Sequence, residues 1–212
     1  MKFISQKLLS MCLVGAALGA TLSACAPVMM GGAVMGSLVA TDRRTSGAQL
    51  EDETIELRAA SRIRDNLGSR GHVNISSYNR RVLLTGEVPS AQDKQLVEQI
   101  VTRVENVQAV VNELAVLGHT TLTQRTSDTL VTGRVKAALL DAKDLFSNAY
   151  KVVTERGTTY LMGRVTQREA DRATDIARST TGVQKVVRVF EIISEDELRN
   201  QLPQPAPAET KK

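Results

Sequence analysis

The sequence is poor in aromatic residues, histidines and cysteines. Aromatic side chains make up 3% of its 212 residues, and tryptophan is absent. Proteins that bind nucleic acids by base stacking need more aromatic platforms than this. The two histidines, His72 and His119, stand beside predicted turns or linkers, and neither has a cysteine or carboxylate at metal-ligand spacing. We therefore expect solvent-exposed histidines and no metal site.

Catalytic motifs and a strong net charge are also missing. The chain has no Gly-x-Ser-x-Gly and no phosphate-binding glycine loop. We interpret carboxylate pairs such as Glu51-Asp52 as ordinary helix starts, where the helix dipole favours negative charge. The net charge is +4, and without Lys2 and Lys7 it falls to +2, too balanced to indicate DNA binding. We predict no enzyme, no nucleic-acid partner and no small-molecule substrate.

The N-terminus has the layout of a secretory signal peptide. Lys2 and Lys7 form a short basic region, and 8–22 is an uncharged, mostly apolar run. The small residues Ser23 and Ala24 follow, as expected at a cleavage site. We therefore predict that residues 1–24 are a signal peptide and that the mature chain begins at Cys25.

The four residues Leu22-Ser23-Ala24-Cys25 resemble a bacterial lipobox. The resemblance implies a diacylglycerol thioether on Cys25 and an acyl chain on its new amino group, with no other cofactor. Two or three buried chains hold a protein on a membrane for practical purposes. Because Ala26 and not Asp follows the cysteine, similarity to lipoprotein sorting signals favours the outer membrane, facing the periplasm.

Other interpretations of this region are a Cys12–Cys25 disulfide, a structural free thiol and a transmembrane helix. Cys12 would leave with the signal peptide, and no folded pattern surrounds Cys25. A transmembrane helix is the main rival, because no charge occurs between Lys7 and Asp42. Proline and glycine residues interrupt any span of about 20 residues there, at Pro27, Gly31, Gly32 and Gly36.

From Asp52 onward the sequence runs twice, offset by 76 or 77 residues. The matching segments are 52–55 with 128–131, 84–88 with 161–165, and 107–111 with 183–187. Each copy predicts the order α-β-β-α-β. Two copies are too few for a solenoid, so the pattern indicates two similar small domains.

The expected elements follow from periodicity and from capping residues. In the first copy we predict a helix with Ile55, Ala59, Ile63 and Leu67 inside, strands at 73–78 and 82–88, a helix opened by Ser90 and Asp93, and a strand from Val107. In the second copy we predict a helix at 127–142, strands at 150–155 and 159–165, a helix opened by a Thr166–Glu169 capping box, and a strand at 183–193 buried on both faces. We expect Gly86 and Gly163 to permit a bulge or close helix packing.

This pattern, with Gly-x-Val ending the second strand and Val-x-x-Val-Val opening the third, resembles the BON domain of bacterial envelope proteins. A lipobox followed by two such domains resembles the DolP family of outer-membrane lipoproteins, and Asp42-Arg43-Arg44 and Ser127-Asp128-Thr129 strengthen the match. The fold class is then α+β, each domain a small mixed sheet packed by two helices. The expected organisation is signal peptide 1–24, lipidated N-terminus and tether 25–49, first domain 50–118, linker 119–126, second domain 127–194 and disordered proline-rich tail 195–212, with a helical turn near 195–202.

The best candidate binding surface is the first helix of the second copy. One stripe holds Leu130, Gly133, Arg134 and Ala137, and another holds Lys136, Leu140 and Lys143. An apolar stripe flanked by basic residues suits the headgroup region of an anionic bilayer. Packing of Leu130 against the first domain is an equally open interpretation. For the matching helix of the first copy, we predict an outer side that is merely exposed to solvent.

The resemblance implies binding of anionic phospholipid and support of outer-membrane integrity. It also implies enrichment at division sites and a link to outer-membrane protein assembly. The alternatives are a protein-interaction scaffold, in which lipid matters only through the anchor, and a periplasmic stress or chaperone protein similar to soluble BON proteins. The sequence leaves open the protein partners, the domain arrangement and the oligomeric state.

Overall fold

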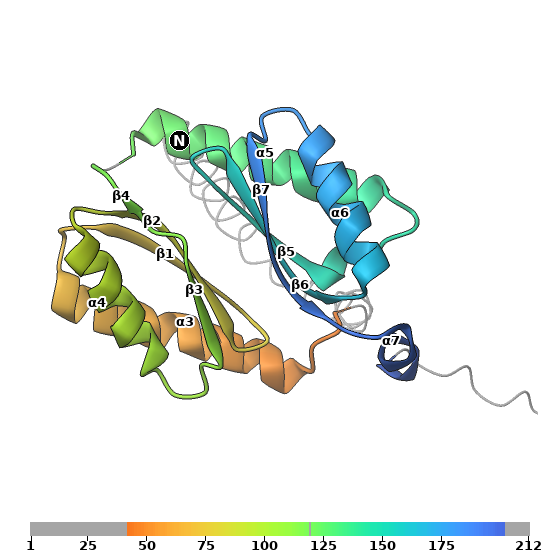
Figure 1. Cartoon of the computed structure of the whole chain (residues 1–212), viewed down its shortest axis with the longest axis horizontal. Coiled ribbons are helices and arrows are strands. Elements are labelled where there is room, and N and C mark those ends of the chain that lie inside the picture. Colours follow the sequence, from red (N-terminus) through yellow and green to blue (C-terminus); the bar gives the residue numbers. More distant parts are fainter. Residues whose placement is uncertain (1–41, 119, 202–212) are drawn as a thin grey trace, which may run out of the picture. The chain divides into compact units, whose positions relative to one another are not determined.

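The computed structural model describes residues 42–118 and 120–201, and these form two copies of one arrangement (Figure 1). The first repeat consists of α3 (Ser46–Leu67), β1 (His72–Tyr78), β2 (Arg81–Val88), α4 (Ala91–Thr102), β3 (Ala109–Asn112) and β4 (Ala115–Val116). The second consists of α5 (Leu122–Asp141), the 3-10 turn η2 (Ser147–Ala149), β5 (Tyr150–Glu155), β6 (Thr158–Val165), α6 (Gln167–Ser179) and β7 (Lys185–Ile192), and α7 (Glu195–Gln201) follows. The predicted α+β fold class is confirmed.

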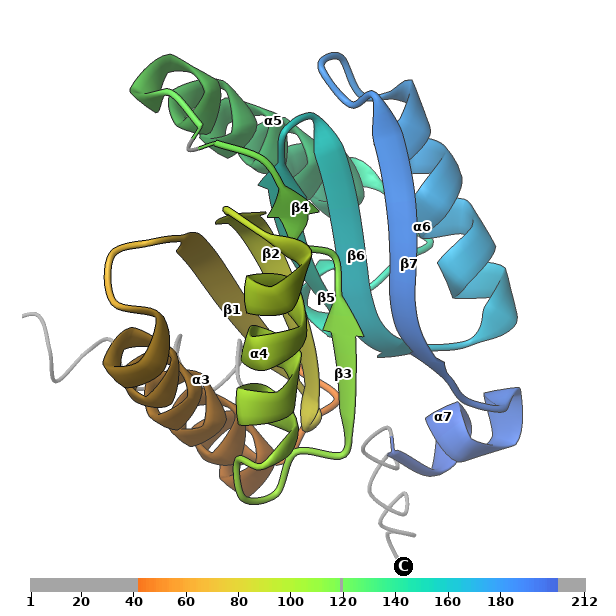
Figure 2. The ribbon, with the colours of Figure 1, turned by 60° about the vertical axis from the view of Figure 1, so that its left-hand side comes forward.

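Each repeat builds one small mixed sheet. β1 and β2 pair antiparallel, and β3 and β4 both pair parallel with β2. In the second repeat β5 and β6 pair antiparallel, and β6 and β7 pair parallel. A parallel neighbour needs a crossover connection, and α4 and α6 supply it. The two helices of each repeat cover one face of its sheet (Figure 2).

The two hairpins turn through two residues with positive φ. These are Asn79 (50°) and Arg80 (63°) in the first repeat, and Arg156 (51°) and Gly157 (73°) in the second. Positive φ at both central positions is the type I′ geometry, whose twist matches that of the flanking strands. The first of these turns lies at the junction between the predicted strands 73–78 and 82–88.

An aspartate from the first helix of each repeat holds its hairpin turn. Asp52 accepts hydrogen bonds from the backbone N–H groups of Asn79 and Arg80, both at 2.8 Å. Asp128 accepts them from Arg156 and Gly157, both at 2.9 Å. Asp52 is buried more than one turn inside α3, so its interpretation as a helix start was wrong. The repeated aspartate satisfies backbone donors that face away from the strand ladder.

Gly86 and Gly163 occupy equivalent places near the ends of β2 and β6. A Cβ atom at Gly86 would lie 2.1 Å from the carbonyl oxygen of His72, and one at Gly163 would lie 2.5 Å from that of Ala149. The β1–β2 register runs without interruption, so there is no bulge there. Glycine is needed because the backbone at the start of the neighbouring strand comes too close for a side chain. The close neighbour is therefore a strand and not a helix, as the alternative of close helix packing had assumed.

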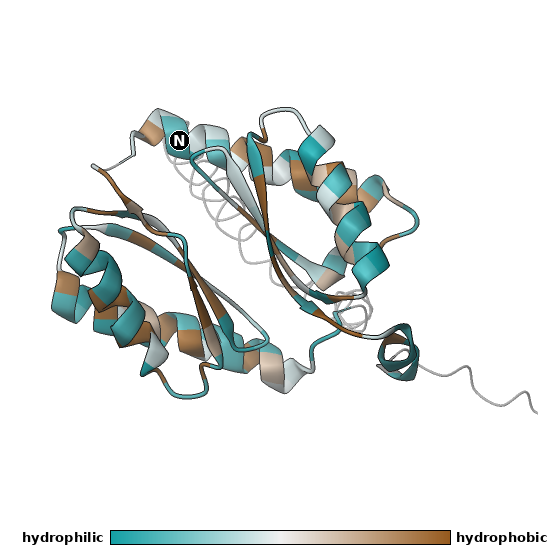
Figure 3. Cartoon of the chain, viewed as in Figure 1, coloured by the Kyte–Doolittle hydropathy of each residue, from teal (hydrophilic) through white to brown (hydrophobic). Residues whose placement is uncertain are grey.

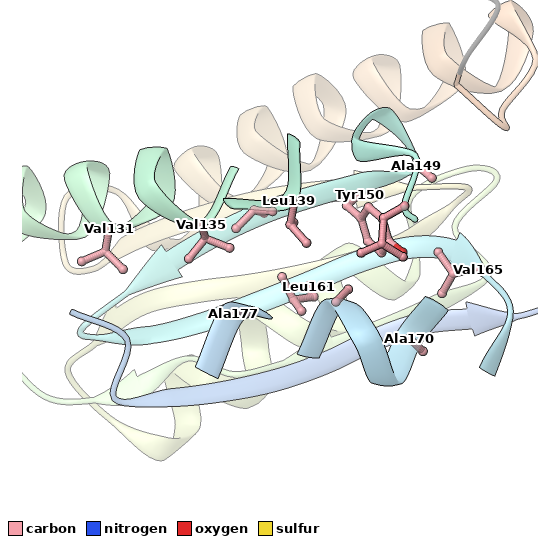
Figure 4. Close-up of a cluster of buried hydrophobic side chains, with 12 residues drawn as sticks. Val131, Val135, Leu139, Ala149, Tyr150, Leu161, Val165, Ala170 and Ala177 are labelled. Carbon is pink, nitrogen blue, oxygen red and sulfur yellow. The ribbon is translucent and has the colours of Figure 1, made fainter. Parts of the chain in front are cut away.

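Each repeat has its own core between its helices and its sheet. In the first, the predicted Ile55, Ala59, Ile63 and Leu67 are buried against the apolar residues of β2 and α4. In the second, Val131, Val135 and Leu139 of α5 meet the sheet and the alanines of α6 (Figure 4). α6 opens with the predicted capping box of Thr166 and Glu169. These cores confirm the helical periodicity that the sequence predicts.

A third cluster joins the two sheets on the faces that the helices leave open. Its buried members come from β1 and β2 of the first repeat and from β6 and β7 of the second, namely Tyr78, Leu83, Tyr160, Met162 and Val189. Hydrogen bonds cross at its margins, from Asn74 to Glu155 and from Asn79 to Glu191. The repeats therefore contact each other sheet to sheet.

Four predicted boundaries and burials differ from the structure. α3 and α5 begin at Ser46 and Leu122, inside the predicted tether and linker, because Thr45 and Thr121 cap them. α7 agrees with the helical turn expected near 195–202, but its Leu198 is buried, so this part of the predicted tail belongs to the fold. β7 is an edge strand, so it is only partly buried, although both of its faces touch a core. The predicted signal peptide, lipidation site and most of the tether lie outside the described residues.

Candidate functional site

α5 carries the predicted surface because its opposite face is fully used by the core. Asp128, Val131, Val135 and Leu139 are its buried residues. With 3.6 residues per turn, this fixes which positions face solvent. All seven predicted site residues are exposed: Leu130, Gly133, Arg134, Lys136, Ala137, Leu140 and Lys143. The helix thus presents them together on its outer side, with Lys143 two residues beyond its end.

Leu130 does not pack against the first repeat. Its side chain is 57% exposed, and Leu140 is 71% exposed. The contact between the repeats uses the two sheets instead. Interdomain packing therefore does not explain the apolar stripe of α5.

The structure adds a leucine that sequence reasoning missed. Leu122 is the first residue of α5 and is 80% exposed. It was missed because the helix was expected to begin at residue 127, and the Thr121 cap is the signal that would have placed the start correctly. We define the α5 outer face as the exposed residues Leu122, Leu130, Gly133, Ala137 and Leu140. Hydrophobic segments are visible along α5 in Figure 3.

The charges around the α5 outer face are mainly positive. Arg134 donates a 3.4 Å hydrogen bond to the carbonyl oxygen of Thr181. Lys136 and Lys143 form no ion pair with any residue in 42–118 or 120–201. The acidic residue on this side of the helix is Asp141. Three basic groups thus flank the apolar stripe, where they can meet an anionic surface.

α3 has exposed leucines of its own, which the prediction of a merely solvated helix overlooked. Leu50 is 65% exposed and Leu57 is 72% exposed. Leu57 lies on a groove between α3 and β1, of about 430 Å³, together with the acidic Glu53 and Glu56. Glu56 is paired with Lys151, and Glu53 is exposed. Arg64 is an exposed basic residue of α3, so the leucines of α3 lie among charges of both signs rather than mainly positive ones.

The histidines and carboxylates form no metal centre in the part of the chain that the structure describes. His72 opens β1, is partly buried and lies 3.4 Å from the Asn74 amide nitrogen, so it is not the exposed loop histidine that we predicted. His119 lies outside the described residues. None of the described helices is long and apolar enough to span a membrane.

The segment Asp42–Arg44, which we call the arginine segment, precedes α3 and contacts both repeats. The Arg43 guanidinium donates to both carboxylate oxygens of Glu169 at 2.7 Å, and the two side chains are only 5% and 1% exposed. Burial opposes the charge on each group, yet this bidentate bond outweighs it. The pKa of Arg43 is therefore raised and that of Glu169 is lowered.

Arg44 points to the first repeat instead. It donates to Asp42 and Asp52, both at 2.8 Å, and its guanidinium lies 4.2 Å from the centre of the Tyr78 ring. Burial in this cluster raises the pKa of Tyr78 to about 12. Sequence reasoning used these arginines only to support the family resemblance, and it did not find Glu169 as the partner of Arg43 because the two residues are 126 positions apart in the chain.

A protein-family model of the BON domain matches residues 51–118 and 127–194. The chain belongs to the BON-domain family. It is 37% identical to the outer membrane lipoprotein DolP of Haemophilus influenzae, over 83% of this chain and 93% of that protein. It is 29% identical to a 21 kDa hemolysin of Actinobacillus pleuropneumoniae, over 72% and 79% of the two chains.

These matches confirm the predicted kinship with outer-membrane lipoproteins that carry two BON domains, and the predicted outer-membrane location. Among solved structures, CdsD, a structural protein of the type III secretion system of Chlamydia trachomatis, aligns at 13% identity and a TM-score of 0.29. That alignment covers 69% of this chain and 98% of the CdsD chain. The family match accounts for the fold of each BON domain, whereas the roles of individual side chains depend on the geometry described above.

Proposed function

We propose that this protein is a non-enzymatic outer-membrane lipoprotein that binds anionic phospholipid through the α5 outer face and so supports envelope integrity. The observation that carries the proposal is the set of exposed leucines on α5, flanked by basic side chains. A helix of this kind lies in the interface plane of a bilayer, with its apolar side chains among the acyl chains. The name of the Haemophilus influenzae relative supports the membrane location.

The proposed anchor is a lipidated Cys25. The relative at 37% identity is a lipoprotein, which supports a lipid modification of this chain. Mass spectrometry of the mature protein from membranes should show a chain that begins at Cys25 and carries diacylglycerol and an N-acyl group. A chain that begins at Met1 or carries an unmodified thiol would contradict the anchor.

The anchor and the α5 outer face have complementary strengths. Each basic residue near an anionic surface contributes about 1 kcal/mol, and partial burial of each leucine adds about 1 kcal/mol more. Such a surface alone binds weakly and reversibly. The anchor keeps the domain near the bilayer and raises its effective concentration to the millimolar range, roughly. Weak contacts with anionic headgroups are then sufficient to distinguish lipid composition.

Vesicle co-sedimentation of the unlipidated fragment 41–212 tests the lipid contact, since these residues form one compact unit. The fragment should bind vesicles that contain phosphatidylglycerol more strongly than vesicles of phosphatidylcholine. Leu130→Glu with Leu140→Glu should abolish this binding. The matched control is Leu50→Glu with Leu57→Glu, which places the same charges on equally exposed positions of α3 and should leave binding intact.

Basic residues are tested separately. Arg134→Gln and Lys136→Gln should each weaken binding to anionic vesicles by about fivefold at low salt, because each removes about 1 kcal/mol. Raising the ionic strength should erase the difference. Equal recovery of the native fragment with both vesicle types would overturn the proposed function.

A protein-interaction scaffold is the second candidate function, and the groove between α3 and β1 favours it. Leu57, Ala60, Val73 and Ile75 line the groove, and β1 is an edge strand. An edge strand beside an apolar groove can accept an extended peptide. Capture of outer-membrane assembly or division-site proteins that is lost with Leu57→Glu, while vesicle binding persists, would favour the scaffold over lipid binding. Chaperone activity predicts instead that the fragment suppresses aggregation of unfolded proteins.

A further inference from the structure

The arginine segment links the tether to a domain other than the one that follows it in the sequence. It directly precedes α3 of the first BON domain, yet Arg43 binds the second. Besides the two bonds to Glu169, its Nη1 donates to the carbonyl oxygen of Arg164 at 3.0 Å, and its guanidinium lies 5.8 Å from the centre of the Phe146 ring. The tether therefore joins the folded unit on the domain that carries the α5 outer face.

The partner of Arg43 is held rigidly. Glu169 is the capping-box residue of α6, and its Oε2 also accepts the backbone N–H of Thr166 at 3.0 Å. Phe146 lies in the short connection between α5 and β5 and is 45% exposed. Both contacts belong to backbone that the core of the second domain fixes, so the position of Arg43 is fixed relative to α5.

Sequence places the arginine segment close to the lipid. Sixteen residues, 26–41, separate Cys25 from Asp42, and none of them is charged. An uncharged, mostly apolar segment of this kind favours the bilayer surface. Asp42 is then the first charged residue after the anchor, and Arg43 follows at once. With the tether on the bilayer surface, whatever Arg43 binds is held close to the membrane.

We propose that the arginine segment is an orienting clasp, which holds the second BON domain against the bilayer so that the α5 outer face meets lipid. The segment acts on both domains, because Arg43 and Arg44 are adjacent and bind different ones. Without Arg43, the tether would be attached only on the first-domain side, and the two domains, which the sheet-to-sheet cluster holds together, would turn as one unit so that α5 leaves the bilayer. This inference rests on the proposed lipid contact of α5.

The test uses full-length lipidated protein in vesicles of phosphatidylethanolamine and phosphatidylglycerol. A fluorophore is attached to Ala137→Cys on α5, or to Leu57→Cys on α3, and lipid-borne quenchers report contact with the bilayer. The introduced thiol is unique because the other cysteines are Cys12, which leaves with the signal peptide, and the acylated Cys25. The label on α5 should be quenched and the label on α3 should not.

Arg43→Gln should remove most of the quenching at residue 137 while the protein stays in the membrane fraction. Glu169→Gln should do the same, since glutamine keeps the capping box but lacks the charge that pairs with Arg43. Arg58→Gln, which breaks an exposed pair with Glu105, is the matched control and should change nothing. Unchanged quenching in both Arg43→Gln and Glu169→Gln would overturn the clasp.

Two results separate the clasp from the lipid contact itself. If the native label at residue 137 is not quenched, the proposed function fails and the clasp fails with it. The unanchored fragment 41–212 with Arg43→Gln should still bind anionic vesicles as the native fragment does, because its α5 outer face is intact. Loss of that binding would show that Arg43 acts by shaping the face, which also contradicts the clasp.

Discussion

At the scale of single residues, the feature that defines this molecule is its buried carboxylates, which accept hydrogen bonds from backbone N–H groups and from arginines. They define it more than any reactive group does. Asp52 and Asp128 occupy equivalent positions and accept the N–H groups of two equivalent turns. Asp52 also accepts from Ser77 and Arg44. These hydrogen bonds satisfy buried donors, and loss of the carboxylate leaves several of them without a partner.

Asp52→Ala should therefore lower the free energy of unfolding by about 2–4 kcal/mol. Urea unfolding of the fragment 41–212, followed by circular dichroism, measures it. Asp65→Ala, at an exposed position of the same helix, should stay within about 0.5 kcal/mol of the native protein. Similar losses for both variants would mean that the hairpin does not depend on Asp52.

Glu155 makes stability depend on pH in the opposite sense from an ordinary paired carboxylate. Burial raises its pKa, and the nearby Glu87 and Asp128 add to this against the hydrogen bond from Asn74. Because the folded pKa exceeds the unfolded one, stability is greatest when Glu155 is protonated and falls as pH rises through the folded pKa. Glu155→Gln should raise the free energy of unfolding at pH 7 by about 1 kcal/mol, which thermal unfolding detects as a higher midpoint. At pH 4 the same substitution should change the midpoint little. A uniform shift at all pH values would contradict this cause.

At the scale of elements, capping and periodicity set each helix, and position in the sheet sets each strand. α5 combines a buried stripe with an outer face that contains a glycine. Gly133 has no atom within 4 Å of the place where a Cβ would stand. A glycine at an exposed position inside a helix costs about 1 kcal/mol relative to alanine.

Gly133→Ala should accordingly stabilise the fragment by about 1 kcal/mol without reducing binding to anionic vesicles, since a methyl group adds to the apolar surface. The contrasting variant is Gly163→Ala, whose Cβ would lie 2.5 Å from the Ala149 carbonyl oxygen and should destabilise. Thermal unfolding and co-sedimentation together measure both effects. Destabilisation by Gly133→Ala would mean that the face is covered in the native protein.

At the scale of the whole molecule, the two BON domains have separate cores but share a third cluster between their sheets. Met162 of β6 is fully buried in that cluster. The contact decides which surfaces are free, because it covers the open faces of both sheets and leaves the outer sides of the helices exposed.

Met162→Asp should open this contact, since a buried carboxylate without a partner is strongly unfavourable. Each domain keeps its own core, so denaturant unfolding of this variant should separate into two transitions, whereas the native fragment should unfold in one. Met162→Leu, which keeps the volume, should cost less than about 1.5 kcal/mol and keep a single transition. One unchanged transition in Met162→Asp would show that the coupling of the domains does not depend on this cluster.

The sequence alone was enough to determine the fold of each domain and the face of α5 that points outward. Helical spacing of Ile55 to Leu67, the capping box at Thr166 and the repeat of Leu-x-Gly-x-Val are local patterns, and local patterns depend on neighbours three or four residues away. Only the tertiary structure decided what covers each surface. The bonds from Arg43 to Glu169, the cluster around Met162 and the burial of Asp52 over its hairpin join residues far apart in the chain. No periodicity records such contacts, because they depend on how completed elements pack in space.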